Sequence, residues 1–294
     1  MGLLSAFRLK VSWTEVAKRT GLQVIKDNVL GWSAELAYYF FLAIFPALLF
    51  LVALASFFPI QALTDEIVNA LAPFAPPDVL TIIRDQLSQI SQNKDGGLLA
   101  IGFVAAAWSA SAGMSATIGT LNQAYHVTER RSWLRVRLTA LLLTGALAVF
   151  VLVSFALILI GPALAETIAG KVGLGPAFVW TWEILQWPLI VALIMTGLGL
   201  VYYVGPDVEQ EWKWTMPGAM VGTVLWLLVS LGFRWYVSSF GDYQKTYGAL
   251  GGVVVTLLWF YVSGLAMLVG AEVNAVLEHS SVIGKDPGER RGRE

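Results

Sequence analysis

Six long apolar runs dominate the pattern of hydrophobic and polar positions along the chain. Each is at least as long as the roughly 20 residues that a helix needs to cross the hydrocarbon core of a bilayer. The strands of a membrane barrel would instead alternate apolar and polar positions over about ten residues. The sequence therefore predicts an all-α polytopic membrane protein, a bundle of six transmembrane helices at about 34–59, 97–121, 138–161, 178–204, 215–240 and 249–275.

Shorter helices are expected outside these spans. Residues 12–28 place apolar and basic side chains on opposite faces, which is typical of a helix lying in the membrane surface. Residues 61–96 show helical spacing on both sides of the proline-containing stretch 73–77, which predicts two short helices. The chain thus divides into an amphipathic segment, a transmembrane domain containing this loop, and a polar tail, at residues 1–33, 34–275 and 276–294.

Lysine and arginine are distributed unevenly between the two sides of the predicted bundle. Fourteen of the 19 fall in the N-terminal segment, the second and fourth loops and the tail, and four fall in the other loops. Cytoplasmic segments carry the excess of basic residues in membrane proteins. Both termini are therefore predicted to lie in the cytoplasm, with the loop 61–96 on the opposite, extracytoplasmic side.

The composition supports lipid as the solvent, and it argues against nucleic-acid binding and against certain metal sites. Hydrophobic residues make up 57% of the 294 positions and charged residues 13%, about half the charged share of a soluble domain. The net charge of −1 provides no basic field for nucleic acid. Without cysteine, and with only two histidines, a thiolate or histidine-rich metal site is excluded.

Enzyme motifs are also absent from the sequence. It contains neither a phosphate-binding loop nor the strand-turn-helix elbow of a serine nucleophile. We therefore expect no catalytic residues, no metal and no cofactor. A membrane enzyme that uses carboxylates alone is the one enzymatic alternative left open.

Polar residues on one face of the first span are candidates for function. Glu35, Tyr38, Tyr39, Leu42 and Pro46 share a helix face, and the proline frees a backbone carbonyl and permits a kink. One interpretation is the wall of a polar cavity inside the bundle. The other is an interfacial acid, two tyrosines at the membrane boundary and an ordinary membrane proline.

The second span is rich in small and hydroxylated residues, including Ser111, and Asn122 follows it. Small residues allow helices to approach closely. A water-lined pathway would favour the same composition, so tight packing and a pathway both remain interpretations of this span.

Two further charged residues lie near the ends of predicted spans. Arg234 falls near the outer interface, where it can reach water, pair with Asp242 or meet an anionic headgroup. Glu272 falls near the cytoplasmic end of the sixth span, at the same depth as Glu35 in the first. The two acids are interpreted either as the rim of an inner vestibule or as residues that simply face water.

Several motifs, in order along residues 20–278, resemble the YihY/BrkB family of membrane proteins. In the first half they are Leu36-Ala37-Tyr38-Tyr39 with Phe45-Pro46, then Trp108-Ser109-Ala110-Ser111 with Leu121-Asn122 and Tyr125. In the second half they are Met216-Pro217-Gly218-Ala219, Tyr243 with Tyr247-Gly248, Trp259-Phe260-Tyr261 and Gly270-Ala271-Glu272-Val273-Asn274-Ala275. Ala43 and Ala110 depart from the family's serines, which argues against a strict hydroxyl relay.

This resemblance implies a bacterial inner-membrane protein with six helices, whose family has been linked to serum resistance and to envelope lipid phenotypes. An old ribonuclease label also attaches to the family, and the absence of metal ligands and of a basic groove argues against it here.

We expect a transporter or translocase of a lipid or amphipathic envelope component; a scaffold for envelope partner proteins is the alternative. Membrane lipids are the expected partners and nucleic acid is not, while association into a homo-oligomer is left open. The candidate substrate-binding or gating residues are Glu35, Tyr38, Tyr39, Pro46, Ser111, Asn122, Arg234, Tyr243, Tyr247, Glu272 and Asn274.

Overall fold

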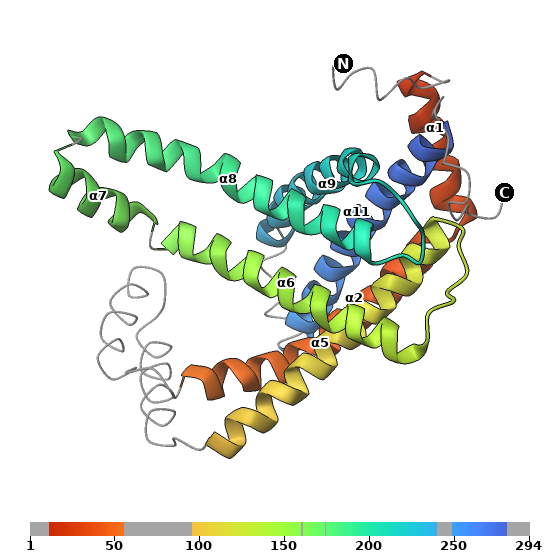
Figure 1. Cartoon of the computed structure of the whole chain (residues 1–294), viewed down its shortest axis with the longest axis horizontal. Coiled ribbons are helices and arrows are strands. Elements are labelled where there is room, and N and C mark those ends of the chain that lie inside the picture. The colour runs from red at the N-terminus through yellow and green to blue at the C-terminus, as the bar shows by residue number, and fades with distance from the viewer. Residues whose placement is uncertain (1–11, 56–95, 160, 174, 240–248, 281–294) are drawn as a thin grey trace. The chain divides into compact units, whose positions relative to one another are not determined.

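The computed structural model describes residues 12–55, 96–159, 161–173, 175–239 and 249–280 (Figure 1). Within these ranges the regular structure is entirely helical. The helices are α1 (Trp13–Lys26), α2 (Val29–Ala55), α5 (Gly96–Ala124), α6 (Trp133–Leu159), α7 (Gly161–Val172), α8 (Gly175–Val204), α9 (Trp212–Ser239) and α11 (Ala249–Ser280).

The described residues contain five helices long and apolar enough to cross a membrane. The count becomes six if α1 and the first part of α2, which meet at 65°, are taken as one bent span. The prediction of an all-α membrane protein is confirmed. Helix boundaries differ from the predicted spans by a few residues because helices continue into the polar interface, as α6 does through Arg135 and Arg137. The short helices predicted within 61–96 concern residues that, up to position 95, lie outside the described ranges.

The helices form two units. The first contains residues 1–39 and 112–294, and the second contains residues 40–111, of which the second half of α2 and the first half of α5 are described. In the first unit α9 packs against α8 and α11, and α1 packs against α11. Helices α6 and α8 lie side by side, with α7 packed on both (Figure 1).

Helix α1 is the amphipathic helix expected within residues 12–28. The Oγ of Ser12 accepts a hydrogen bond from the backbone N–H of Glu15 at 3.3 Å, so the sequence Ser-x-x-Glu caps the helix at its start. Val16 is buried against α11 in a cluster with Val273, Val276 and Leu277. Val16 thus anchors α1 to α11, while Trp13 and Ile25 are exposed.

Helix α7 was not expected from the sequence. It has 12 residues, too few to span a bilayer. Pro162 occupies its first turn, where the missing N–H costs nothing. Gly173 ends it in a left-handed conformation (φ 74°) and donates its N–H to the Ala169 carbonyl at 2.9 Å. The helix was missed because its apolar content continues that of α6 and gives no separate signal.

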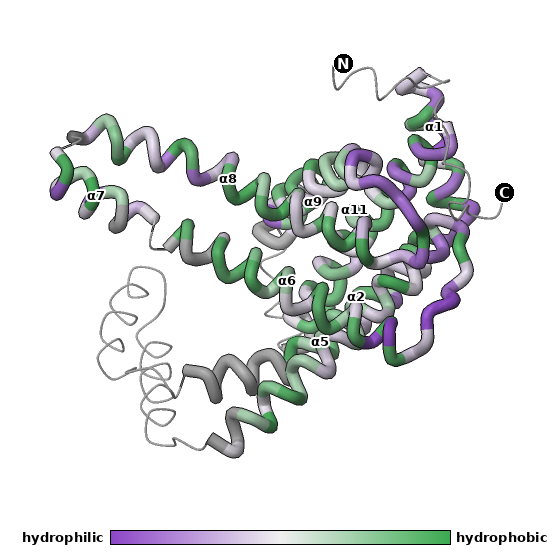
Figure 2. The backbone as a smooth tube through the Cα atoms, in the orientation of Figure 1, coloured by the Kyte–Doolittle hydropathy of each residue, from purple (hydrophilic) through white to green (hydrophobic). Residues whose placement is uncertain are grey.

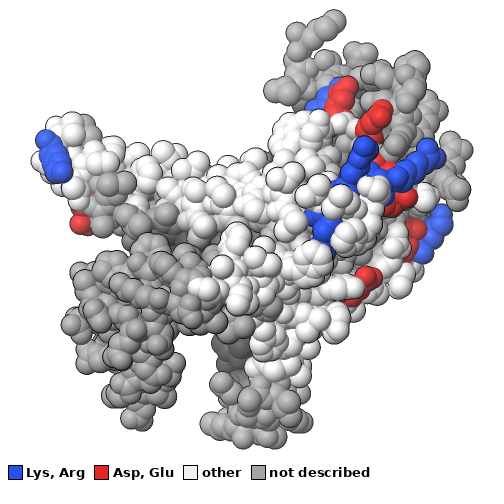
Figure 3. All heavy atoms as spheres, turned by 60° about the horizontal axis from the view of Figure 1, so that its bottom comes forward, with Lys and Arg blue, Asp and Glu red and all other residues white. Residues whose placement is uncertain are grey.

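Charged residues of the first unit gather at one end. Figure 2 shows hydrophilic positions concentrated in α1, in the α5–α6 loop and in the α8–α9 loop, whereas hydrophobic positions predominate along the long helices. The space-filling view in Figure 3 shows acidic and basic side chains together at this end, with a second small group at the tip formed by α7 and α8. The long helices between them expose a surface almost without charge on the visible face, as lipid requires.

Candidate functional site

A pocket of about 380 Å³ lies among α2, α5 and α6, and we call it the polar pocket. On α5 it is lined by residues at positions 112, 115, 116, 119, 120 and 123, which fall on one helix face. On α2 it is lined by Glu35 and Tyr39, one turn apart. The small face of the second predicted span therefore lines a pocket, beside two of the residues predicted from the first span.

The polar pocket carries charges of both signs. Glu35 lines it from α2 and Arg137 from α6. The Nη1 of Arg137 lies 3.5 Å from the Oγ of Ser115, at the limit of a hydrogen bond. Thr120 also lines the pocket and donates its hydroxyl to the carbonyl of Thr117 at 2.9 Å. A ligand here would find a guanidinium, a carboxylate and hydroxyl groups within one cavity.

A second pocket of about 440 Å³, the carboxyl pocket, lies where α1 and α11 meet the loop that follows α5. Its ionisable lining residues are Arg19, Lys26, Asp27, His126, Glu272 and His279. Glu272 is fully buried, and neither of its carboxyl oxygens has a hydrogen-bond partner among the described residues. Asp27 and His126 form an ion pair when the imidazole is protonated, with Nε2 3.3 Å from Oδ2.

The end of α5 sets the position of His126. The N–H of His126 donates to the carbonyl of Gln123 and the N–H of Val127 donates to the carbonyl of Asn122, at 2.9 and 2.8 Å. This pattern is a Schellman motif, in which His126 takes the left-handed position usually filled by glycine (φ 54°). The motif turns the chain out of α5 and brings the imidazole to Asp27 at the end of α1.

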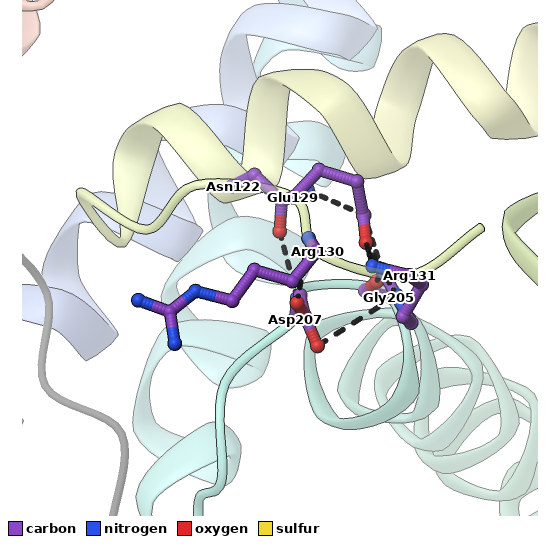
Figure 4. A network of polar contacts seen from close by, with 6 residues as sticks. All are labelled: Asn122, Glu129, Arg130, Arg131, Gly205 and Asp207. Atoms are coloured by element: carbon purple, nitrogen blue, oxygen red, sulfur yellow. Dashed lines mark hydrogen bonds and ion pairs between the residues drawn. The ribbon is translucent and has the colours of Figure 1, made fainter. Parts of the chain in front are cut away.

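Asn122, one of the predicted residues, is buried outside both pockets, in a partly buried network that joins two loops (Figure 4). Its Nδ2 donates to the Glu129 carboxylate at 2.9 Å, and its Oδ1 accepts the N–H of Asp207 at 2.7 Å. Arg131 binds the Glu129 carboxylate through Nε and Nη2 at 2.9 and 2.7 Å, and its Nη2 also donates to the carbonyl of Gly205 at 2.7 Å. The α5–α6 loop is thereby attached to the α8–α9 loop.

Charge balance within this network follows from its hydrogen bonds. Burial raises the pKa of Glu129, but the hydrogen bonds from Arg131 and Asn122 outweigh it and hold that pKa below its ordinary value of 4.5. The same hydrogen bond raises the pKa of Arg131. The network therefore joins the Arg131 guanidinium to two carboxylates, that of Glu129 and, at 3.9 Å, that of Asp207, and it holds the loops in place.

Asn274 also has a structural position, between α11 and α9. Its Oδ1 accepts the N–H of Gly218 at 2.6 Å, and its Nδ2 donates to the carbonyl of Thr215 at 3.1 Å. The two helices approach so closely that a Cβ at Gly218 would run into the carbonyl oxygen of Gly270. Close approach through glycines is characteristic of membrane helix pairs.

The remaining predicted residues are dispersed. Tyr38 is exposed, Ser111 is buried and donates to the carbonyl of Trp108 at 2.9 Å, and Arg234 is exposed near the end of its candidate span. Pro46 lies within α2, but its side chain is outside the described residues, as are Tyr243, Tyr247 and Asp242. Glu35 and Glu272, expected at one depth, line two different pockets.

Three pocket residues were not among the predicted ones: Asp27, His126 and Arg137. Asp27 and His126 lie in turns between helices, where a polar residue is unremarkable. The sequence does offer a signal for Arg137, because this arginine stands one turn inside α6, beyond the arginines of the preceding loop.

The fold and its charge distribution define a polytopic α-helical membrane protein, and sequence comparison identifies the family. The family model described as Virulence factor BrkB matches residues 22–294, so the chain belongs to the BrkB family. That description names no catalytic activity.

Curated relatives carry two kinds of names. A ribonuclease-like protein of Bacillus subtilis, YfkH, is 38% identical over 248 residues, covering 83% of this chain and 88% of that protein. UPF0761 membrane proteins of Stenotrophomonas maltophilia and Xanthomonas campestris are each 27% identical over 85% of this chain. The chain spans only 58% and 57% of their respective lengths. No solved structure matches.

Proposed function

We propose that this protein is a transporter or translocase of a lipid or amphipathic envelope component, and not an enzyme. The polar pocket is the observation that carries the proposal. It is a cavity with ionisable and hydroxyl groups on helices whose other faces are strongly apolar. Polar groups are expensive at membrane depth, and they commonly mark the path of a substrate.

The charges in the polar pocket suit a headgroup that carries both signs. The guanidinium of Arg137 can bind phosphate oxygens in a two-pronged geometry. The carboxylate of Glu35, across the same cavity, can accept hydrogen bonds from an ammonium or hydroxyl group. The small residues at positions 112, 116 and 119 leave room for such a headgroup.

We place the protein in the bacterial inner membrane with both termini in the cytoplasm. The lysine and arginine residues of α1 and of the α5–α6 loop support this orientation, because cytoplasmic segments carry the excess of basic residues in membrane proteins. The polar pocket would then open near the inner leaflet, because Glu35 and Gln123 lie at the ends of their helices nearest those segments.

Vesicles reconstituted with the full chain and a fluorescent phospholipid test the proposal. The measurement is the rate at which labelled lipid becomes accessible to a quencher on the other side of the membrane. We expect wild type to move lipid and the Glu35→Ala, Arg137→Gln double variant to lose most of this activity. The matched control replaces exposed charges outside the pocket, as Glu183→Ala with Arg135→Gln, and should keep the wild-type rate.

Equal rates in the double variant and wild type would remove the polar pocket from the mechanism. Absence of lipid movement by correctly folded wild type, combined with capture of a partner protein by the full chain, would instead favour the scaffold alternative.

A further inference from the structure

Glu272 is a buried carboxylic acid that lies outside the polar pocket. It has an exposed fraction of 0%, it lines the carboxyl pocket, and both of its oxygens lack a hydrogen-bond partner among the described residues. Most buried polar groups in proteins have such a partner. An unpaired buried carboxylate ion would carry a large desolvation cost. A ligand that neutralises the carboxyl removes that cost.

Among the described residues, none of the basic groups that line the carboxyl pocket forms an ion pair with Glu272. Arg19 also lines the pocket, but its Nε pairs with Glu15 at 2.8 Å. Lys26 lines the pocket and is exposed, with no described ion pair to Glu272. The face of α9 that contacts this end of α11 presents Thr215 and Gly218, which carry no charge.

The remaining ionisable neighbours are acids, a phenol and imidazoles. Asp27 lines the same pocket and pairs with His126 at 3.3 Å. The buried phenol of Tyr125, next to His126, lies close enough to feel the charges of Glu272 and Glu278. The His279 ring contacts its own helix, with Nδ1 2.6 Å from the carbonyl oxygen of Ala275. A second carboxylate in the pocket makes a charge on Glu272 still less favourable.

A metal ion is not the ligand that this geometry favours. Among the described residues no three histidine, aspartate or glutamate side chains are placed to hold one ion. The smallest cation that a single buried carboxyl can take up is a proton. We propose that Glu272, with the Asp27–His126 pair beside it, forms a proton-binding site that exchanges with water through the carboxyl pocket.

The Asp27–His126 pair provides the route between Glu272 and water. An imidazole can accept and release a proton at physiological pH, which suits it to relay one. Both residues lie where helices end, at the C-cap of α1 and at the left-handed position after α5, so the backbone fixes them. Loss of the proton would leave a buried charge close to the contact of Val16 with Val273 and Val276, which holds α1 on α11. Proton occupancy is therefore coupled to the packing of α1.

Infrared spectroscopy of the full chain in lipid tests the site directly, without a transport assay. A protonated carboxylic acid has a carbonyl band distinct from that of a carboxylate. We expect wild type at neutral pH to show such a band, the band to shift on transfer to D₂O, and Glu272→Gln to lose it. Glu272→Gln keeps the shape of the protonated acid without charge, so the variant should fold. The band should disappear on raising the pH, and at a less alkaline pH in Asp27→Asn, because the neighbouring negative charge is gone.

Three results would overturn the proposal. A Glu272 band that is insensitive to D₂O and to alkaline pH would make the group a permanently neutral part of the core. No band in wild type at neutral pH would mean that the carboxyl is ionised and has found another partner. Loss of the band on adding sodium at constant pH would identify a metal-cation site instead. None of these results depends on whether the polar pocket moves lipid, since the two pockets share no residue.

Discussion

The backbone N–H of Asp207 donates a hydrogen bond to Oδ1 of Asn122 at 2.7 Å, although 85 residues separate the two. Both side chains are buried. On the other side of the amide, Nδ2 of Asn122 donates to Glu129. One side chain thus satisfies groups from two loops, and its removal would leave a buried backbone donor without a partner.

We expect Asn122→Ala to destabilise the protein by about 1–3 kcal/mol, the cost of leaving a buried polar group unsatisfied. Thermal unfolding of purified protein in detergent measures the effect. Thr128→Ala replaces an exposed residue of the same loop and should stay within about 0.5 kcal/mol of wild type. If the two variants unfold together, the network of Figure 4 does not hold the loops.

Acid should weaken the same network through Glu129. Its pKa lies below the ordinary value of 4.5 in the folded chain because of its bonds to Arg131 and Asn122. A group with a lowered folded pKa stabilises the protein above its unfolded pKa, and this stabilisation is lost as the pH falls through the folded pKa. Wild type should therefore lose more stability than Glu129→Gln as the pH falls below about 4.5. Unfolding temperatures across an acid series give the difference, and parallel curves would contradict it.

Glycines on α9 differ sharply in what surrounds them. A Cβ at Gly218 would collide with the carbonyl of Gly270 and with Asn274, whereas a Cβ at Gly232 meets nothing within 4 Å. Gly218→Ala should cost about 1–3 kcal/mol through overpacking. Gly232→Ala should be neutral or stabilise by up to about 1 kcal/mol, because alanine is the better helix former. The comparison is made by thermal unfolding, and equal effects would refute the close helix crossing.

Tyr202 connects α8 to α11 close to the point where α9 and α11 cross. Its buried hydroxyl donates to the carbonyl of Met267 at 2.5 Å. Tyr202→Phe keeps the ring and should lose about 0.5–1.5 kcal/mol, the net value of a typical hydrogen bond. The adjacent Tyr203 is exposed, so Tyr203→Phe offers a matched control. An unchanged unfolding temperature in Tyr202→Phe would mean that the bond contributes nothing to stability.

The membrane-spanning helices could be predicted from the sequence because a continuous apolar run in lipid has few alternatives to a helix. Helix α1 was equally predictable, because its apolar and basic side chains fall on opposite faces of a helix. Helix α7 was not, since a short helix after a span leaves no break in hydropathy. Its end depends on Gly173, whose left-handed conformation becomes evident only in three dimensions.

From the sequence, residues of a candidate site could be grouped correctly only when they belong to the same helix. Glu35 and Tyr39 line one pocket because residues four apart share a helix face. Depth along a helix does not tell which neighbour a side chain meets, and Glu35 and Glu272 therefore lie in different pockets despite their similar depth. The residues that line the carboxyl pocket beside Glu272 include Asp27 and His126, which lie in turns distant in sequence, and no local pattern distinguishes them.

Filling the polar pocket should block function without disturbing the fold. Gly119 lines this pocket, and a Cβ at Gly119 meets nothing within 4 Å. Gly119→Leu would therefore project an apolar side chain into the pocket and displace a polar headgroup. Gly145 on α6 is equally open but does not line the pocket, so Gly145→Leu is the matched control. We expect at least about tenfold weaker phospholipid binding by Gly119→Leu, equivalent to about 1.4 kcal/mol, with similar unfolding temperatures for both variants. Binding is measured with a fluorescent phospholipid in detergent, and unchanged affinity in Gly119→Leu would exclude this cavity as the headgroup site.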